Sequence, residues 1–169
     1  WAIVASVVTL ITAIVGIYAM PASMHQFEAT WLPSIGANFS VALDGMSKML
    51  VLLTAISMPL IFIATRNNNY NNPGVFYALM LLAQSGLVGV FISMDALLFY
   101  FFWELALIPV YFLCSIWGGE KRIAITFKFF IYTFLGSLFM LIGILFLNAH
   151  TAEHSFSIQA FIHANLTGG

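Results

Sequence analysis

The 169-residue chain is 62% hydrophobic and only 7% charged, and its mean hydropathy is +1.02. This composition excludes a soluble domain and is typical of an integral membrane protein. The formal net charge of −1 and the lack of a basic cluster exclude nucleic acid as a partner. Cys114 is the single cysteine and lies in an apolar stretch, so it offers neither a disulfide pair nor a thiolate metal site.

Five stretches are apolar enough for helices that cross a bilayer, whose hydrocarbon core of about 30 Å needs about 20 residues per crossing. The first is expected at residues 1–20, and because the chain begins inside this hydrophobic run, we expect it to be part of a longer protein. A loop is expected at residues 22–43. The second span is expected at 46–65, with Asp44 as its N-cap and Lys48 placed to pair with Asp44.

The remaining spans follow a loop rich in turn residues, Asn67–Gly74. The apolar region of residues 75–117 is about twice as long as one bilayer crossing at about 1.5 Å per helical residue, so it must fold back. Asp95 is the only charge before Glu104 in this region, and we expect a tight turn there, with Asp95 as a solvated cap. The expected spans are therefore residues 75–92, 96–117 and 125–147, followed by an outer tail at 148–169.

The cations predict the orientation of these spans. Arg66, Lys121, Arg122 and Lys128 fall in or beside alternate loops, and the positive-inside rule places these loops in the cytoplasm. The start of the chain is then inside, and the first loop, the Asp95 turn and the tail are outside. The expected fold class is all-α: a polytopic transmembrane helix bundle of about five spans in a single membrane domain.

Glu104 lies within the fourth span and is the leading functional candidate. Insertion scales assign an ionised acid at the centre of a membrane helix a cost of roughly 2.5 to 3.5 kcal/mol, so acids at this depth by default mark ion or proton paths. At about 100° per residue, four polar side chains lie within about 60° of one another and form a stripe that can hold water. They are Tyr100, Glu104, Tyr111 and Ser115. The alternative is that Glu104 only bonds a neighbouring helix.

Two further residues bear on Glu104. Pro109 lacks an amide hydrogen and disturbs the carbonyl of Leu105, which suits a kink and a small hydrated cavity beside the acid. Lys128 is the candidate cation that would change the proton affinity of Glu104, although it lies nearer the cytoplasmic face and its long stem can also snorkel to the interface.

Other polar and small residues in the sequence suggest packing. Small or polar residues in the third and fifth spans are expected to let helices approach closely. They are Gln84, Gly86, Gly89, Gly136, Ser137 and Gly143. His150 and His154 have the spacing of a helical metal pair, but no third ligand falls in a recognisable pattern, so we expect no metal site. The chain also has no glycine-rich nucleotide loop, cysteine cluster or haem-ligand pattern, so any redox cofactor is expected elsewhere.

Three blocks of the sequence together carry a family resemblance. The first opens the second span, the second contains Glu104 and Pro109, and the third begins at Lys128. The blocks are Leu43-Asp-Gly-Met-Ser47, Phe101-Phe-Trp-Glu-Leu-Ala-Leu-Ile-Pro-Val-Tyr-Phe112 and Lys128-Phe-Phe-Ile-Tyr-Thr-Phe-Leu-Gly-Ser137. Together they resemble the proton-pumping antiporter-like subunits of respiratory complex I, in particular the family of NADH-quinone oxidoreductase subunit M and mitochondrial subunit 4.

The resemblance implies a fourteen-helix proton channel subunit of which this chain supplies the second to sixth helices. It implies that Glu104 is essential for proton translocation and pairs with a lysine on the seventh helix of the subunit, which we expect to lie outside this chain. Lys128 matches a lysine that assists the pathway. NADH, FMN, iron-sulfur clusters and quinone would be bound by partner subunits of complex I, in the bacterial inner membrane rather than the mitochondrial one. Two alternatives remain: a homologous subunit of a cation/proton antiporter or membrane-bound hydrogenase, and a structural membrane scaffold with an inert Glu104.

Overall fold

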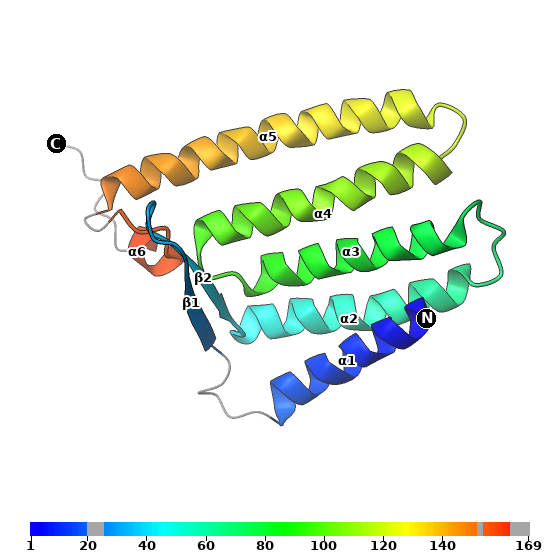
Figure 1. The fold of residues 1–169 in the computed structure, drawn as a ribbon, viewed down its shortest axis with the longest axis horizontal. Coiled ribbons are helices and arrows are strands. Elements are labelled where there is room, and N and C mark those ends of the chain that lie inside the picture. Colours follow the sequence, from blue (N-terminus) through cyan, green and yellow to red (C-terminus); the bar gives the residue numbers. More distant parts are fainter. Residues whose placement is uncertain (20–25, 152–153, 163–169) are drawn as a thin grey trace.

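The computed structural model describes residues 1–19, 26–151 and 154–162. Figure 1 shows the long helices side by side in chain order. They are α1 Ala2–Tyr18, α2 Gly45–Thr65, α3 Pro73–Ile92, α4 Ala96–Trp117 and α5 Arg122–His150. Among the described residues, α2 to α5 are long and apolar enough to cross a membrane, and α1 is an apolar helix of 17 residues. The predicted helix bundle is thus confirmed, with α5 extending beyond the expected 125–147 at both ends.

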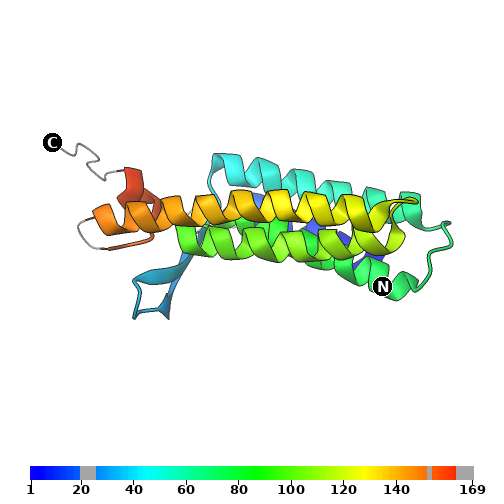
Figure 2. The same cartoon turned by 90° about the horizontal axis from the view of Figure 1, so that it is seen from above.

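The connections between the helices gather at two ends of the bundle (Figures 1 and 2). The α2–α3 and α4–α5 loops, which carry Arg66 and Lys121, lie at one end, called here the cationic end. The α3–α4 turn, both strands and α6, Ile158–Ile162, lie at the opposite end, called here the hairpin end. The structure therefore separates the loops into the two groups on which the predicted orientation rests.

The expected loop at residues 22–43 contains a β-hairpin, so this part of the prediction is wrong. Strands β1, Gln26–Leu32, and β2, Ala37–Ala42, pair antiparallel, with Phe27 opposite Val41. Polar and apolar residues alternate from Gln26 to Trp31, which is the period of a half-buried strand and was overlooked beside the stronger helical signals. Residues 20–25 lie outside the described residues.

The turn between α3 and α4 is held from both sides. Its Met94 N–H donates to the Ser40 carbonyl of β2 at 2.9 Å, and its Met94 carbonyl accepts from Ile158 N–H at 3.0 Å. The first amide of α4, on Ala96, donates to the Phe156 carbonyl at 2.8 Å. Residues 154–162 of the expected outer tail therefore return to the start of α4. It joins the hairpin and the turn in one hydrogen-bonded unit that fixes the start of α4.

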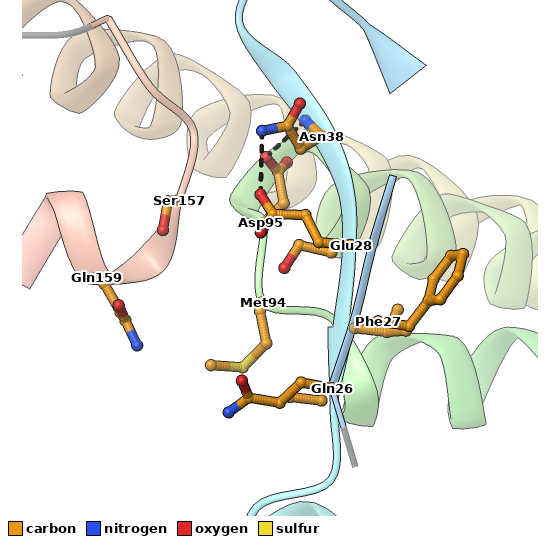
Figure 3. A pocket seen from close by; sticks show the side chains of 11 residues that line it. Gln26, Phe27, Glu28, Asn38, Met94, Asp95, Ser157 and Gln159 are labelled. Carbon is orange, nitrogen blue, oxygen red and sulfur yellow. Dashed lines mark hydrogen bonds between the residues drawn. The ribbon is translucent and has the colours of Figure 1, made fainter. Parts of the chain in front are cut away.

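Asp95 caps α4 as predicted, but it is buried rather than solvated, with 2% of its surface exposed. One carboxylate oxygen accepts from the backbone N–H groups of Leu97 and Leu98, at 2.9 and 3.1 Å. The other accepts from Asn38 N–H of β2 at 3.2 Å, and the Asn38 side chain donates to Glu28 at 3.3 Å (Figure 3). The hairpin thus shields Asp95 from water. A polar hollow of about 170 Å³ remains beside Asp95.

The helices α3 and α4 approach closely where the sequence predicts. A Cβ added to Gly86 would lie 2.9 Å from the Cα of Ala106, and one added to Gly89 would overlap the ring of Phe102. At Gly136 and Gly143 a Cβ would meet no described atom within 4 Å, so these two glycines bring no described helices together and their packing role stays a prediction. Glycine in α3 thus sets the distance between α3 and α4, the helix that carries Glu104.

Candidate functional site

Glu104 lies near the middle of α4, eight residues from the capped start at Ala96, or about 12 Å along the axis at about 1.5 Å per residue. Its side chain is half-buried, and its Oε1 atom is buried without a hydrogen-bond partner among the described residues. The predicted depth of the carboxylate inside the apolar bundle therefore agrees with the structure.

Tyr100 lies one turn before Glu104 on α4. Its hydroxyl group is near the Glu104 carboxylate and the Ser137 hydroxyl of α5, but it forms no hydrogen bond with either of these described residues. The Tyr100 ring packs against a core cluster at the hairpin end, formed by Ala37, Ala96, Ile144 and Phe156. Because a phenol has a single proton to donate, Tyr100 can donate to Glu104 or to Ser137 but not to both.

Ser137 is the neighbour of this site that the sequence interpretation assigned only to helix packing. It is buried, with 3% of its surface exposed, and its hydroxyl donates to the Phe134 carbonyl at 2.9 Å. Its oxygen is then free to accept a hydrogen bond from Tyr100. A serine in the block that begins at Lys128 was the available signal, but the sequence does not show which turn of α5 faces Glu104.

The other members of the predicted stripe lie toward the cationic end. The Tyr111 ring contacts Phe130 of α5, with centroids 5.1 Å apart, two turns from Glu104. Ser115 lies one turn further and donates to the Phe112 carbonyl of its own helix at 3.2 Å. The structure therefore brings Tyr100 next to Glu104, and it places Tyr111 and Ser115 along the same helix but not at the carboxylate.

Pro109 is fully buried within α4, and the helix continues through it. Since proline has no amide hydrogen, the carbonyl of Leu105 has no i+4 partner in the helix. This carbonyl belongs to the residue that follows Glu104. The backbone beside the carboxylate thus lacks one regular helical hydrogen bond, and the predicted kink and hydrated cavity stay a prediction.

Lys128 is exposed on α5 and lies two residues before Phe130, the residue that contacts Tyr111. It is therefore about two turns nearer the cationic end than Glu104, on the side that the sequence predicted. In the described part of the chain no ion pair joins Lys128 to Glu104. Its assisting role stays a prediction.

The described residues contain no group of three or more His, Cys, Asp or Glu side chains that could hold a metal ion. His150 ends α5 and its ring packs against Phe146, with centroids 4.2 Å apart. His154 lies beyond the helix, with a backbone φ of 46°. The two histidines therefore do not share the helical face that their spacing suggested.

Comparisons with known proteins find a family, relatives and solved structures that match this chain. Residues 93–167 match the family described as NADH:quinone oxidoreductase/Mrp antiporter, TM. The chain is 42% identical over 146 residues to the F(420)H(2) dehydrogenase subunit M of Methanosarcina mazei, covering 83% of this chain and 30% of the relative. It is 46% identical over 129 residues to an NAD(P)H-quinone oxidoreductase chain 4 of Trichormus variabilis, covering 75% of this chain and 24% of the relative. The chain thus spans less than a third of the length of these relatives.

Solved structures share the fold. A chain of respiratory complex I from Thermus thermophilus superposes with a TM-score of 0.76 at 25% identity, covering 98% of this chain and 40% of that chain. A chain of the Mrp complex from Dietzia sp. gives a TM-score of 0.75 at 18% identity, covering 94% of this chain and 17% of that chain. The second likeness concerns the fold alone.

Proposed function

Because the chain belongs to the antiporter-like membrane subunits of the NADH:quinone oxidoreductase and Mrp antiporter family, we propose that it is part of a proton-translocating subunit of a quinone-reducing dehydrogenase. In this proposal the subunit has no redox site of its own. NADH or a similar donor, FMN, iron-sulfur clusters and quinone are bound by partner subunits, and the complex lies in a bacterial inner membrane.

The observation that carries the proposal is the buried, unpartnered Oε1 of Glu104. An ionised carboxylate with an unpartnered oxygen in a low-dielectric site has nothing to compensate for the solvation by water that it has lost. A protonated carboxyl group is neutral, so it can remain there at a lower cost. A cation that approaches Glu104 would favour release of its proton, and a cation that leaves would favour uptake. Glu104 is then a proton carrier whose state follows a movable charge.

Tyr100 and the break in the backbone at Pro109 fit this role. When Glu104 is ionised, the Tyr100 hydroxyl can donate to it, and when Glu104 is protonated, the hydroxyl can turn to Ser137. The Leu105 carbonyl, which lacks its i+4 helical donor, can accept a hydrogen bond from a water molecule beside the carboxylate. Water at this position would carry the proton to and from Glu104.

The test is Glu104→Gln in the complete complex, with Glu104→Asp as the conservative variant. Electron transfer and acidification of inverted membrane vesicles are measured together. We expect Glu104→Gln to assemble, and its acidification to fall to the level of uncoupled vesicles, because an amide cannot exchange a proton at neutral pH. Glu104→Asp should keep part of the activity. Normal acidification with the amide in place would instead support the structural scaffold.

A homologous antiporter or hydrogenase subunit would use the same carboxylate with a different energy source. The named relatives favour the dehydrogenase, because both are subunits of enzymes that oxidise a reduced cofactor. Vesicle acidification started by NADH, by reduced F420 or by a sodium gradient distinguishes these sources. Acidification with a sodium gradient alone would favour the antiporter.

A further inference from the structure

The side chain of Tyr100 joins two parts of the bundle. Its hydroxyl group is near the Glu104 carboxylate and the Ser137 hydroxyl, and it forms no hydrogen bond with either of them. Its ring packs against the core cluster of the hairpin end. Because the phenolic oxygen is part of a rigid aromatic side chain, the packing of the ring determines where the hydroxyl lies relative to Glu104.

The core cluster brings together four segments of the chain. It contains Ala37 of β2, Ala96 at the start of α4, Ile144 of α5, and Phe156, which precedes α6. Phe156 is the largest of the four side chains and has 3% of its surface exposed. A buried aromatic ring supplies a large share of the contact area in a cluster whose other members are smaller. The position of Phe156 therefore determines the shape of the cluster against which Tyr100 packs.

The backbone on both sides of Phe156 is bonded to the start of α4. The Phe156 carbonyl accepts from the Ala96 N–H at 2.8 Å, and the Ile158 N–H donates to the Met94 carbonyl at 3.0 Å. Ala96 lies four residues, or about one helical turn, before Tyr100 and shares a face of α4 with it. The segment that contains Phe156 is thus fixed to α4 one turn from Tyr100.

Packing, and not hydrogen bonding, orients Tyr100 in the part of the chain that the structure describes. We propose that Phe156 is a positioning residue for the Glu104 site and acts through Tyr100: it holds the ring where the hydroxyl group can donate to the carboxylate. The inference rests on the proposed role of Glu104 as a proton carrier. A displaced Tyr100 would leave the ionised carboxylate without this donor, and Glu104 must pass through the ionised state in each cycle.

A double-mutant cycle in the complete complex tests the proposal. The variants are Phe156→Ala, Tyr100→Phe and the two together, and the measurement is acidification of inverted vesicles divided by the amount of assembled complex. Phe62→Ala is the matched control, because it makes the same substitution at a fully buried phenylalanine of α2. The Phe62 ring packs against Tyr77, with centroids 5.5 Å apart, and is not part of the core cluster. Phe156→Leu is the conservative variant.

We expect Phe156→Ala and Tyr100→Phe each to lower acidification several-fold. The double variant should be within about twofold of the slower single variant, because Phe156 then has no hydroxyl left to position. The effect of Phe62→Ala, a distant site, should instead multiply with that of Tyr100→Phe. Phe156→Leu keeps most of the volume and should retain at least about half of the acidification.

Multiplied effects of Phe156→Ala and Tyr100→Phe would overturn the proposal, and so would normal acidification with Phe156→Ala. If Phe156→Ala does not assemble, Ile144→Ala opens the same cluster from α5 and carries the same expectations. Glu104→Gln in the same vesicles separates this result from the proposed function. Lost acidification with Glu104→Gln, together with multiplied effects in the cycle, would refute the positioning role alone.

Discussion

Replacing Asp95 by alanine is expected to loosen the hairpin end of the bundle. The carboxylate accepts two N–H groups of the first turn of α4 and the N–H of Asn38, and it is almost fully buried. Loss of an N-cap costs about 0.5 to 2 kcal/mol. A buried N–H left without a partner costs about 1 to 3 kcal/mol, so together we expect about 1.5 to 5 kcal/mol.

This magnitude can be measured locally by amide hydrogen exchange in the complete complex. A loss of about 1.5 to 5 kcal/mol in the free energy of local opening corresponds to exchange about 10 to 5,000 times faster at Asn38, Leu97 and Leu98. Asp95→Asn separates the two contributions, because its amide oxygen can still cap α4 while its NH₂ group cannot accept from Asn38. Asn38 should then exchange faster while Leu97 stays protected.

The reasoning is refuted if Asp95→Ala leaves exchange at Asn38 and Leu97 unchanged. That result would mean that the buried carboxylate does not hold the hairpin to α4. Amides in the middle of α2, far from the hairpin end, serve as the internal reference in every variant.

Three further predictions concern other parts of the bundle. The Ser47 N–H donates to the carboxylate of Asp44 and holds the pKa of Asp44 below its ordinary value of 3.8. The stabilising cap is therefore fully present above about pH 4 and is lost as the pH falls through the lower pKa of the folded state. Amide exchange at the start of α2 should rise only in that acidic range, and Asp44→Asn should abolish this pH dependence. Tyr100→Phe should lower vesicle acidification several-fold without loss of assembly, and acidification as fast as in the parent complex would exclude its part in proton transfer. Gly86→Val should destabilise the subunit by about 1 to 3 kcal/mol, whereas Gly143→Ala should leave its thermal stability unchanged.

The sequence was sufficient to predict the long helices and the side-chain caps of α2 and α4. Asp44 accepts the Ser47 N–H at 2.6 Å and lies within the electrostatic range of Lys48, and Asp95 begins α4 at the expected residue. These features depend on neighbours in the chain and on a long apolar period, which a single sequence records directly. The depth of Glu104 follows from the same signals.

Contacts between distant segments were not predictable in this way. The burial of Asp95 depends on Asn38, and the neighbour of Tyr100 on α5 depends on how two helices are rotated about their axes. A hydrophobic helix with similar residues on all sides gives little indication of that rotation, since lipid and protein neighbours are both apolar.

The hydrogen bond from Ala96 to Phe156 joins the start of α4 to a residue that follows the whole of α5. During synthesis the ribosome therefore releases both helices before this bond can form, and α4 enters the bilayer with its first turn incompletely fixed. Domain-by-domain assembly of this kind leaves early segments exposed until later ones arrive. Truncations that end between α5 and Phe156 should insert the same helices and yet be degraded faster. The segment that contains Phe156 would then stabilise the bundle only after α5 has been inserted.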